Sequence, residues 1–304
     1  MQAVSAFDRS SITHDYAQVG NLRLHYAECG QLNDRLVILL HGFPEFWYSW
    51  RHQMPVLGAH YHVVAPDMRG YNLSDKPPRV ADYQIDYLVA DVLGLIRHFG
   101  KSQAVIIAHD WGAGVAWALA QKHPEAVERL AALQVPPPVA WRENMTFAQL
   151  RRSWYMFFFQ LPRLPEWWAG ANDFARVDEM YRKTSVRPGA FSDEDIEAYK
   201  DAMRQPRALT SSLNYYRANV FRSLFRGGVE TPNESDGRIR APTLFIYGEQ
   251  DMAVLPSTVK DLGRFIDAPY REVRIPDSGH WVQNEAVTEV NTALLQFLSE
   301  KFQQ

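Results

Sequence analysis

The chain has 304 residues, of which 46% are hydrophobic and 22% charged, and its formal net charge is −3. This composition is that of a globular protein, and no basic excess points to nucleic acid or an anionic membrane as a partner. Cys29 is the single cysteine, so it has no internal disulfide partner. The first residues lack a secretory pattern and no run reaches the ~20 apolar residues of a spanning helix, so we expect a soluble, cytoplasmic protein.

The first half of the chain predicts strands that alternate with helices. It opens with a β-hairpin over 13–30. Four short runs rich in Val, Ile and Leu follow, at 35–42, 61–67, 103–110 and 129–136. Helical patterns lie between them, near 47–58, 85–99 and 111–122. Apolar strands that alternate with helices are typical of a parallel sheet buried on both faces.

The pattern then changes to helical and aromatic-rich segments with no clear strand, from about 141 to 235. Strands return at 241–251 and 270–280, and a helix over 285–302 ends the chain. We therefore predict an α/β core, 1–136 and 236–304, with an inserted helical cap, 137–235. The cleft between two such parts commonly holds a ligand.

The stretch Ala108-His109-Asp110-Trp111-Gly112 follows the strand at 103–110 and opens the next helix. Small outer residues around a central side chain are typical of a nucleophile elbow, where strand and helix approach closely. Asp110 is then the nucleophile, and the helix N-terminus favours its charge. The other interpretation is that Asp110 only caps the helix. The local motif does not decide between them.

A histidine and an acid stand where a nucleophile–acid–histidine order requires them. His280 is the single histidine after His123, and it follows the last predicted strand. Asp251 follows the strand before it, in a loop suited to orienting an imidazole. Asp277 and Glu249 are the alternatives for the acid. We predict the triad Asp110, Asp251 and His280.

The segment "HGFPEFWYSW", 41–50, is a turn after a central strand. We expect the backbone N–H groups of Phe43 and Trp111 to form an oxyanion hole. The side chains of Phe43, Trp111 and Trp281 are expected to line the substrate pocket. Glu45 either holds the hydrolytic water or tunes His280, or it is a surface acid of the turn.

A carboxylate nucleophile indicates substitution at a saturated carbon, because the ester it forms can be hydrolysed again. Two leaving groups fit this chemistry, a halide or the oxygen of an epoxide. An epoxide oxygen leaves as a strong base and needs an acid, which is typically worth ~10²–10⁴-fold in rate.

Four motifs together resemble the soluble epoxide hydrolases of the α/β-hydrolase fold: "HGFPEFWYSWRHQMP", "APDMRGYNLSDKP", "AHDWG" and "DSGHW". The resemblance runs from about residue 14 to the end. It implies an epoxide substrate, water as co-substrate, and two cap tyrosines that donate to the epoxide oxygen. The family pattern places these at Tyr155, in "YMFFFQLP", and Tyr216, in "LNYYR", with Tyr215 as the alternative.

Other functions remain open at this point. A haloalkane or haloacid dehalogenase uses the same nucleophile, but such enzymes tend to have Asn where this chain has Phe43, or Arg where it has Trp111. A binding protein that kept the fold is a third possibility. No cofactor and no metal site is expected, and the chain is expected to be a monomer or homodimer without nucleic-acid or membrane partners. The aromatic cluster 154–168 is either a membrane-facing patch or the face that docks the cap onto the core. We expect docking, because cap helices need an apolar face against the core.

Overall fold

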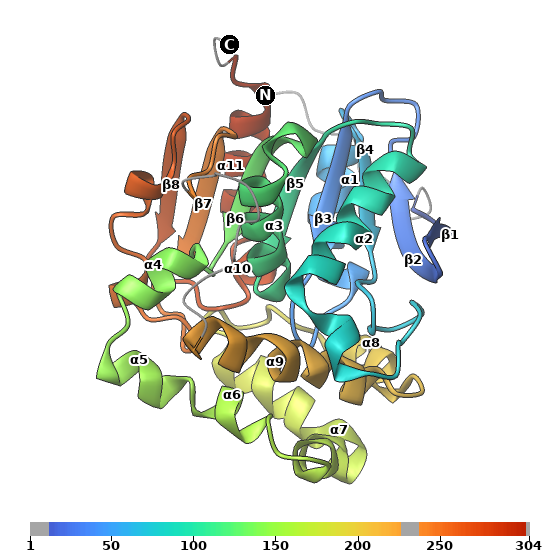
Figure 1. The fold of residues 1–304 in the computed structure, drawn as a ribbon, viewed down its shortest axis with the longest axis vertical. Coiled ribbons are helices and arrows are strands. Elements are labelled where there is room, and N and C mark those ends of the chain that lie inside the picture. The colour runs from blue at the N-terminus through green and yellow to red at the C-terminus, as the bar shows by residue number, and fades with distance from the viewer. Residues whose placement is uncertain (1–11, 226–236, 302–304) are drawn as a thin grey trace.

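The computed structural model describes residues 12–225 and 237–301, in which eight strands form one sheet of order β1-β2-β4-β3-β5-β6-β7-β8 (Figure 1). The strand β2 pairs antiparallel with β1 and β4, and the remaining neighbours are parallel. The strands are β1 (Thr13–Val19), β2 (Leu22–Cys29), β3 (Leu36–Leu40), β4 (His62–Pro66), β5 (Ala104–His109), β6 (Val127–Leu133), β7 (Thr243–Gly248) and β8 (Tyr270–Ile275). The predicted fold class, a mostly parallel sheet flanked by helices, is confirmed.

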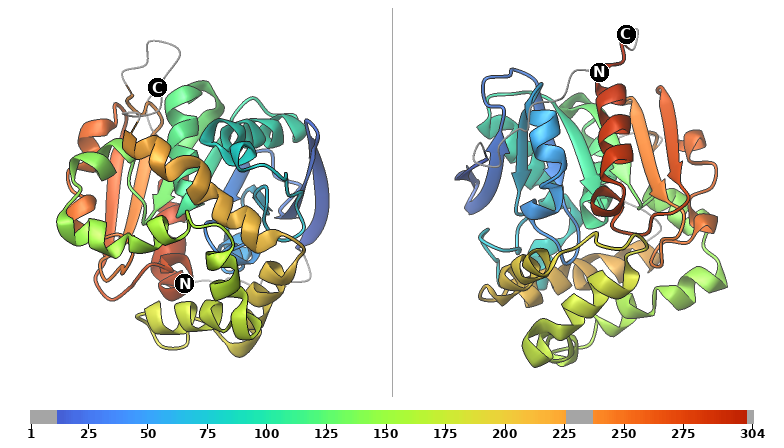
Figure 2. Two further views of the ribbon diagram at one scale, coloured as in Figure 1. Left: turned by 60° about the horizontal axis from the view of Figure 1, so that its bottom comes forward. Right: turned by 180° about the vertical axis from the view of Figure 1, so that it is seen from behind.

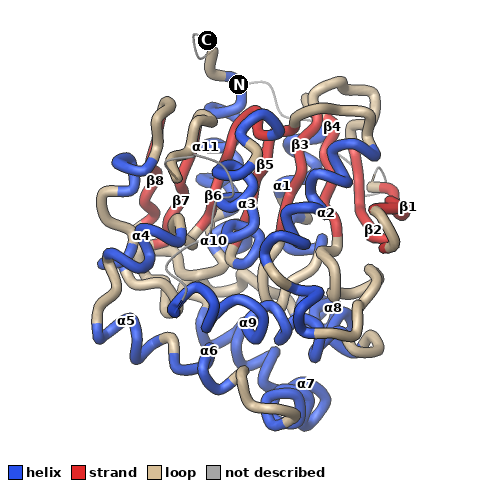
Figure 3. The backbone as a smooth tube through the Cα atoms, in the orientation of Figure 1, coloured by secondary structure: helices blue, strands red, loops and turns tan. Residues whose placement is uncertain are grey.

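Helices cover both faces of the sheet because neighbouring strand residues point to opposite sides. Ile38 and Ile106 belong to one buried cluster, with α2 (Ile85–His98) and α3 (Trp111–Lys122). Val37 and Val105, one residue earlier on the same strands, belong to the other, with α1 (Gln53–Gly58) and α11 (Val287–Ser299). Figure 3 shows the two layers, and the view from behind in Figure 2 shows α1 and α11. The central strands are apolar throughout because both of their faces are buried.

One predicted helix is wrong. The segment 47–58 is split into a short 3-10 helix, Trp47–Trp50, and α1. A continuous helix would place Pro55 in its interior, where proline removes a hydrogen bond and clashes with the preceding turn. In α1, Pro55 lies in the first turn, where it is tolerated.

Six helices lie between β6 and β7 in the described residues: α4 (Pro138–Glu143), α5 (Phe147–Arg152), α6 (Trp154–Phe158), α7 (Leu164–Thr184), α8 (Asp193–Arg204) and α9 (Ala208–Phe225). They form a layer across the carboxyl ends of the parallel strands, at the bottom of Figure 1. Helix α9 lies next to the sheet, and α6 and α7 lie beyond it (Figures 1 and 2). The carboxyl ends of β3, β5 and β7 therefore face this helical layer.

Candidate active site

Asp110 occupies a strained turn between β5 and α3. Its backbone has φ 49° and ψ −119°, and a positive φ of this kind costs of order 1–3 kcal/mol outside glycine. The neighbouring positions have to be small: a Cβ on Gly112 would lie 2.3 Å from the Leu40 carbonyl oxygen, and one on Gly42 would lie 2.3 Å from the Asp110 Cβ. This is the geometry of a nucleophile elbow, which presents one side chain at the strand end.

The Asp110 carboxylate faces the loop after β3. Its Oδ1 accepts a hydrogen bond from the Phe43 backbone N–H at 2.8 Å. It makes no capping bond to α3, whose residues 111–122 are all described. The interpretation of Asp110 as only a helix cap is therefore wrong. Phe43 N–H reaches the carboxylate oxygen itself, whereas a role for the Trp111 N–H stays a prediction.

His280 stands between two carboxylates. Its Nδ1 lies 2.8 Å from Asp251 Oδ2, and its Nε2 lies 3.7 Å from Asp110 Oδ2. Asp251 is fully buried, and its Oδ1 accepts the backbone N–H groups of Ala253 at 2.6 Å and Val254 at 3.0 Å. These two bonds hold Asp251 against the imidazole.

The charges of this group stabilise one another. Burial acts to lower the pKa of His280, but the carboxylates of Asp251 and Asp110 outweigh it and raise that pKa well above its ordinary value. Burial acts to raise the pKa of Asp110, but His280 and the Phe43 N–H hold it below its usual range. The resting arrangement is therefore an imidazolium beside an ionised Asp110.

Tyr155 and Tyr216, the two tyrosines that the resemblance implies, lie near each other and within the electrostatic influence of Asp110. Tyr216, on α9, is buried, and its ring centre lies 6.0 Å from that of Tyr155, on α6. Burial, together with the negative charge of Asp110, raises the pKa of both phenols well above the ordinary value. The rings of Phe43 and Trp111 pack edge-on against Tyr216 at 5.5 and 5.1 Å. Both phenols thus stay protonated near neutral pH and keep a proton to donate.

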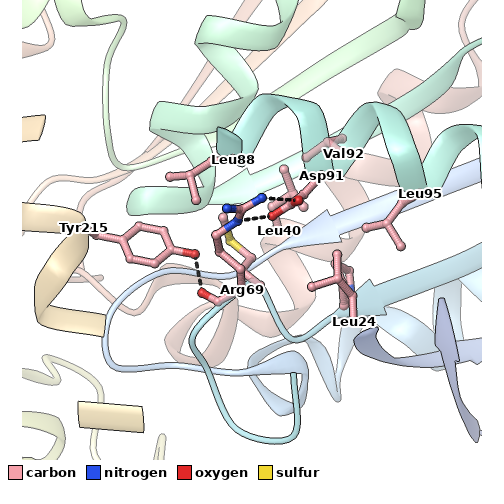
Figure 4. Close-up of a pocket in the computed structure, with 10 residues that line it drawn as sticks. Leu24, Leu40, Arg69, Leu88, Asp91, Val92, Leu95 and Tyr215 are labelled. Carbon is pink, nitrogen blue, oxygen red and sulfur yellow. Dashed lines mark hydrogen bonds and ion pairs between the residues drawn. The ribbon is translucent and has the colours of Figure 1, made fainter. Parts of the chain in front are cut away.

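The adjacent tyrosine points elsewhere. The Tyr215 hydroxyl donates to the Arg69 carbonyl oxygen at 2.8 Å, and the Arg69 side chain is paired with Asp91 on α2 (Figure 4). The cavity that these residues line has a volume of about 10 Å³, which suffices for about one water molecule and no substrate. Tyr215 therefore joins α9 to the core, and it points away from the site that Tyr216 faces.

Comparison with known proteins agrees with this geometry. Residues 35–287 match the alpha/beta hydrolase fold family. The chain is 38% identical to epoxide hydrolase 3 of Mus musculus, over 92% of this chain and 74% of that protein. The chain belongs to the epoxide hydrolase family of the alpha/beta hydrolase fold.

Two further comparisons show how much of the chain resembles known proteins. The AB hydrolase superfamily protein YfhM of Bacillus subtilis is 37% identical, over 94% of this chain and 98% of that protein. The crystal structure of the Bacillus megaterium epoxide hydrolase in complex with an inhibitor matches with a TM-score of 0.85 at 31% identity, covering 94% of this chain and all of that one. The likeness therefore spans the sheet and the helical layer alike.

Glu45 lies in the interior, so its interpretation as a surface acid is wrong. It is fully buried, and its Oε2 lies 3.0 Å from the Gly42 N–H and 2.7 Å from His109 Nδ1. Its Oε1 accepts from the Ser49 hydroxyl and from Gln283 Nε2. Burial acts to raise the pKa of Glu45, but His109 outweighs it and lowers that pKa.

His109 is a site residue that the sequence analysis missed. Its Nε2 lies 2.8 Å from the backbone carbonyl oxygen of His280, which can only accept. Its Nδ1 lies 2.7 Å from the Glu45 carboxylate, so each ring nitrogen lies beside an oxygen that can accept a hydrogen bond. The pair connects the loop after β3, the elbow and the segment that carries His280. In the sequence, the one feature that could have pointed to His109 is that a polar residue ends an otherwise apolar strand.

The remaining candidates fall outside the group around Asp110. Asp277 pairs with Arg187 at 2.9 Å on the surface, and Glu249 faces Arg274 at 3.7 Å, so neither touches His280 in this structure. Trp281 is buried, with its ring 4.9 Å from that of His280. Its indole N–H donates to the Thr184 hydroxyl. Its contact with substrate stays a prediction.

Proposed function

We propose that the protein opens an epoxide to a vicinal diol through an ester on Asp110. The observation that carries the proposal is the position of Asp110, which has a histidine–acid pair on one side and two protonated phenols on the other. A nucleophile, a proton donor for the leaving oxygen and a base for the second step are the three groups that the reaction needs. The epoxide hydrolases among its relatives support the same reaction.

In the first step, an Asp110 oxygen attacks an epoxide carbon and the carbon–oxygen bond of the ring breaks. The ring oxygen takes a proton from Tyr155 or Tyr216, and the phenolate that remains recovers a proton from the His280 imidazolium. The products are a hydroxy-ester and a neutral His280. Because Asp110 no longer carries a negative charge, one of the two groups that raise the His280 pKa is gone, and the imidazole becomes available as a base.

In the second step, His280 takes a proton from water and the hydroxide adds to the Asp110 ester carbonyl. The oxyanion that forms occupies the place where Oδ1 now accepts from the Phe43 N–H. Donors fixed at such a position stabilise the charge without reorganisation. Collapse releases the diol and restores the Asp110 carboxylate beside a protonated His280, so the protons balance over the cycle.

The surrounding side chains favour an uncharged, apolar substrate. Phe43, Phe159 and Tyr216 pack edge-on against one another with ring centres 5.0 to 5.6 Å apart. Aromatic walls of this kind bind apolar groups by burial of their surface. We assign the helices of 137–235 as the cap that supplies this wall, with 1–136 and 236–304 as the core.

The test is product analysis with styrene oxide and a 1-haloalkane as alternative substrates. We expect diol formation from the epoxide and no halide release. The double variant Tyr155→Phe/Tyr216→Phe is expected to lose about 10²–10⁴-fold in epoxide turnover, while Tyr87→Phe, at an exposed tyrosine on α2, retains it. Halide release that survives the double substitution would identify a dehalogenase.

A further inference from the structure

The outer side of the helical layer exposes an unusual number of large apolar side chains. Seven of the thirteen that the described residues expose fall within 147–167. We call these the aromatic patch: Phe147, Leu150, Trp154, Phe157, Leu161, Leu164 and Trp167. Phe147, Trp167 and Trp154 are 82%, 71% and 56% exposed. The expectation that the cluster 154–168 docks onto the core is therefore wrong for its five members in the patch, Trp154, Phe157, Leu161, Leu164 and Trp167.

The patch is ordered along the chain rather than scattered. Its members recur at intervals of three and four residues along α5, α6, the turn that follows α6 and the start of α7. These helices lie on the side of the molecule away from the sheet (Figure 1). On α6, Tyr155 packs on Phe159 and Tyr216, and Met156 and Phe158 also pack against the core, whereas Trp154 and Phe157 are exposed. A grouped apolar surface of this kind marks a binding surface.

The charges around the patch are of one sign. Residues 144–165 contain Arg151, Arg152 and Arg163 and no acidic residue, and all three arginines are exposed. The acids that flank the stretch are engaged, since Glu143 pairs with Arg264 at 2.6 Å and Glu166 with Arg217 at 2.7 Å. The patch therefore combines exposed Trp, Phe and Leu with three exposed arginines that form no ion pair with an acid among the described residues, although the whole chain is negative.

We propose that the aromatic patch docks the protein on an anionic lipid bilayer. Tryptophan and other apolar side chains enter the headgroup region, and arginines beside them attract acidic headgroups. A second copy of the chain is a poorer occupant, because a two-fold contact would bring the same arginines of both copies together with no acid to pair them. In the described part of the chain no helix is both long and apolar enough to cross a bilayer, so the association is with its surface. The association itself does not depend on the reaction.

Vesicle flotation of the full chain tests the proposal, with phosphatidylcholine vesicles that contain or lack phosphatidylglycerol. We expect binding to the vesicles with phosphatidylglycerol that weakens as salt is raised. The variant Trp154→Ser/Trp167→Ser is expected to bind at least about tenfold more weakly, and Arg151→Gln/Arg163→Gln at least about fivefold. The matched controls are Leu32→Ser and Arg97→Gln, at exposed positions outside the patch, which bind like the unaltered chain.

Circular dichroism melts accompany each variant, and an unchanged melting temperature assigns the lost binding to the surface. Equal binding to both kinds of vesicle, or no binding to either at low salt, overturns the proposal. So does a dimer in sedimentation experiments that the tryptophan variant dissociates, because the patch is then covered by a second copy.

Discussion

Two adjacent tyrosines on α9 are expected to differ in what they support. Substituting phenylalanine for Tyr215 should lower the stability of the fold, and substituting phenylalanine for Tyr216 should lower the rate of epoxide opening. Tyr215→Phe removes the hydroxyl that donates to the Arg69 carbonyl oxygen at 2.8 Å. Tyr215 is fully buried and Arg69 is 7% exposed, so water does not readily replace the lost donor. A buried acceptor left without its partner costs about 1–3 kcal/mol, which for a chain of this length lowers the melting temperature by about 2–6 °C. The turnover rate stays within about threefold, because Tyr216 keeps its position on the packed helix.

Tyr216→Phe removes instead the hydroxyl that we propose as a proton donor to the epoxide. This hydroxyl is hydrogen-bonded to the side chain of Trp111, which is only half-buried, so the melting temperature is expected to fall by less than in Tyr215→Phe. The rate of epoxide opening falls by about 10²-fold if one of two donors is lost. Thermal melts and steady-state kinetics on both variants measure the two effects. A rate loss in Tyr215→Phe that equals the one in Tyr216→Phe would refute the assignment of the two side chains.

Three further predictions concern the buried charges. His280→Gln is expected to stop the reaction at the ester, so intact mass spectrometry shows the chain plus one substrate; an unmodified mass after incubation contradicts the role of His280 as base. Glu45→Gln breaks the buried pair with His109 and is expected to lower the free energy of unfolding by about 3–5 kcal/mol, measured by urea titration. The control Glu125→Gln, at a side chain that is 71% exposed, should change this free energy by less than about 0.5 kcal/mol. The pKa of His280 in the folded state is raised above 6.5, its ordinary value. Its ion pairs with Asp251 and Asp110 therefore stabilise the fold fully below pH 6.5, and this stabilisation is lost as the pH rises through the folded-state pKa. The stability difference between the unaltered chain and His280→Gln should therefore shrink above pH 6.5, and a constant difference would show that the pairing is neutral.

The sequence predicts the sheet and the elbow well because both depend on local pattern. Apolar runs such as 103–110 do not alternate between polar and apolar residues. They therefore predict strands that are buried on both faces of the sheet rather than strands with one exposed face. The helix after the elbow runs over Trp111–Lys122, as predicted. The helix expected at 47–58 is divided into two short helices because Pro55 is tolerated only near a helix start, which the apolar periodicity alone does not show.

Orientation and burial of single side chains are harder to predict because distant segments decide them. Tyr215 and Tyr216 differ by about 100° around the helix, and only the contact with Arg69 shows which one faces the core loop. Glu45 occurs in a turn and reads as exposed, but Gln283, 238 residues away, is one of its partners. For the aromatic cluster 154–168 the sequence favours docking, because an apolar helix face usually packs on the core. The structure leaves Trp154, Phe157 and Trp167 exposed, since the core covers only part of the apolar side chains of this segment.

The central claim is that substrate becomes covalently attached to the Asp110 carboxylate. A single-turnover reaction in ¹⁸O-water, with enzyme in excess over epoxide, tests it directly. The ester mechanism predicts that the first diol carries an unlabelled oxygen from the enzyme and that the peptide containing Asp110 gains ¹⁸O. A first diol that already carries the label, with Asp110 unlabelled, would mean that water attacks the epoxide directly.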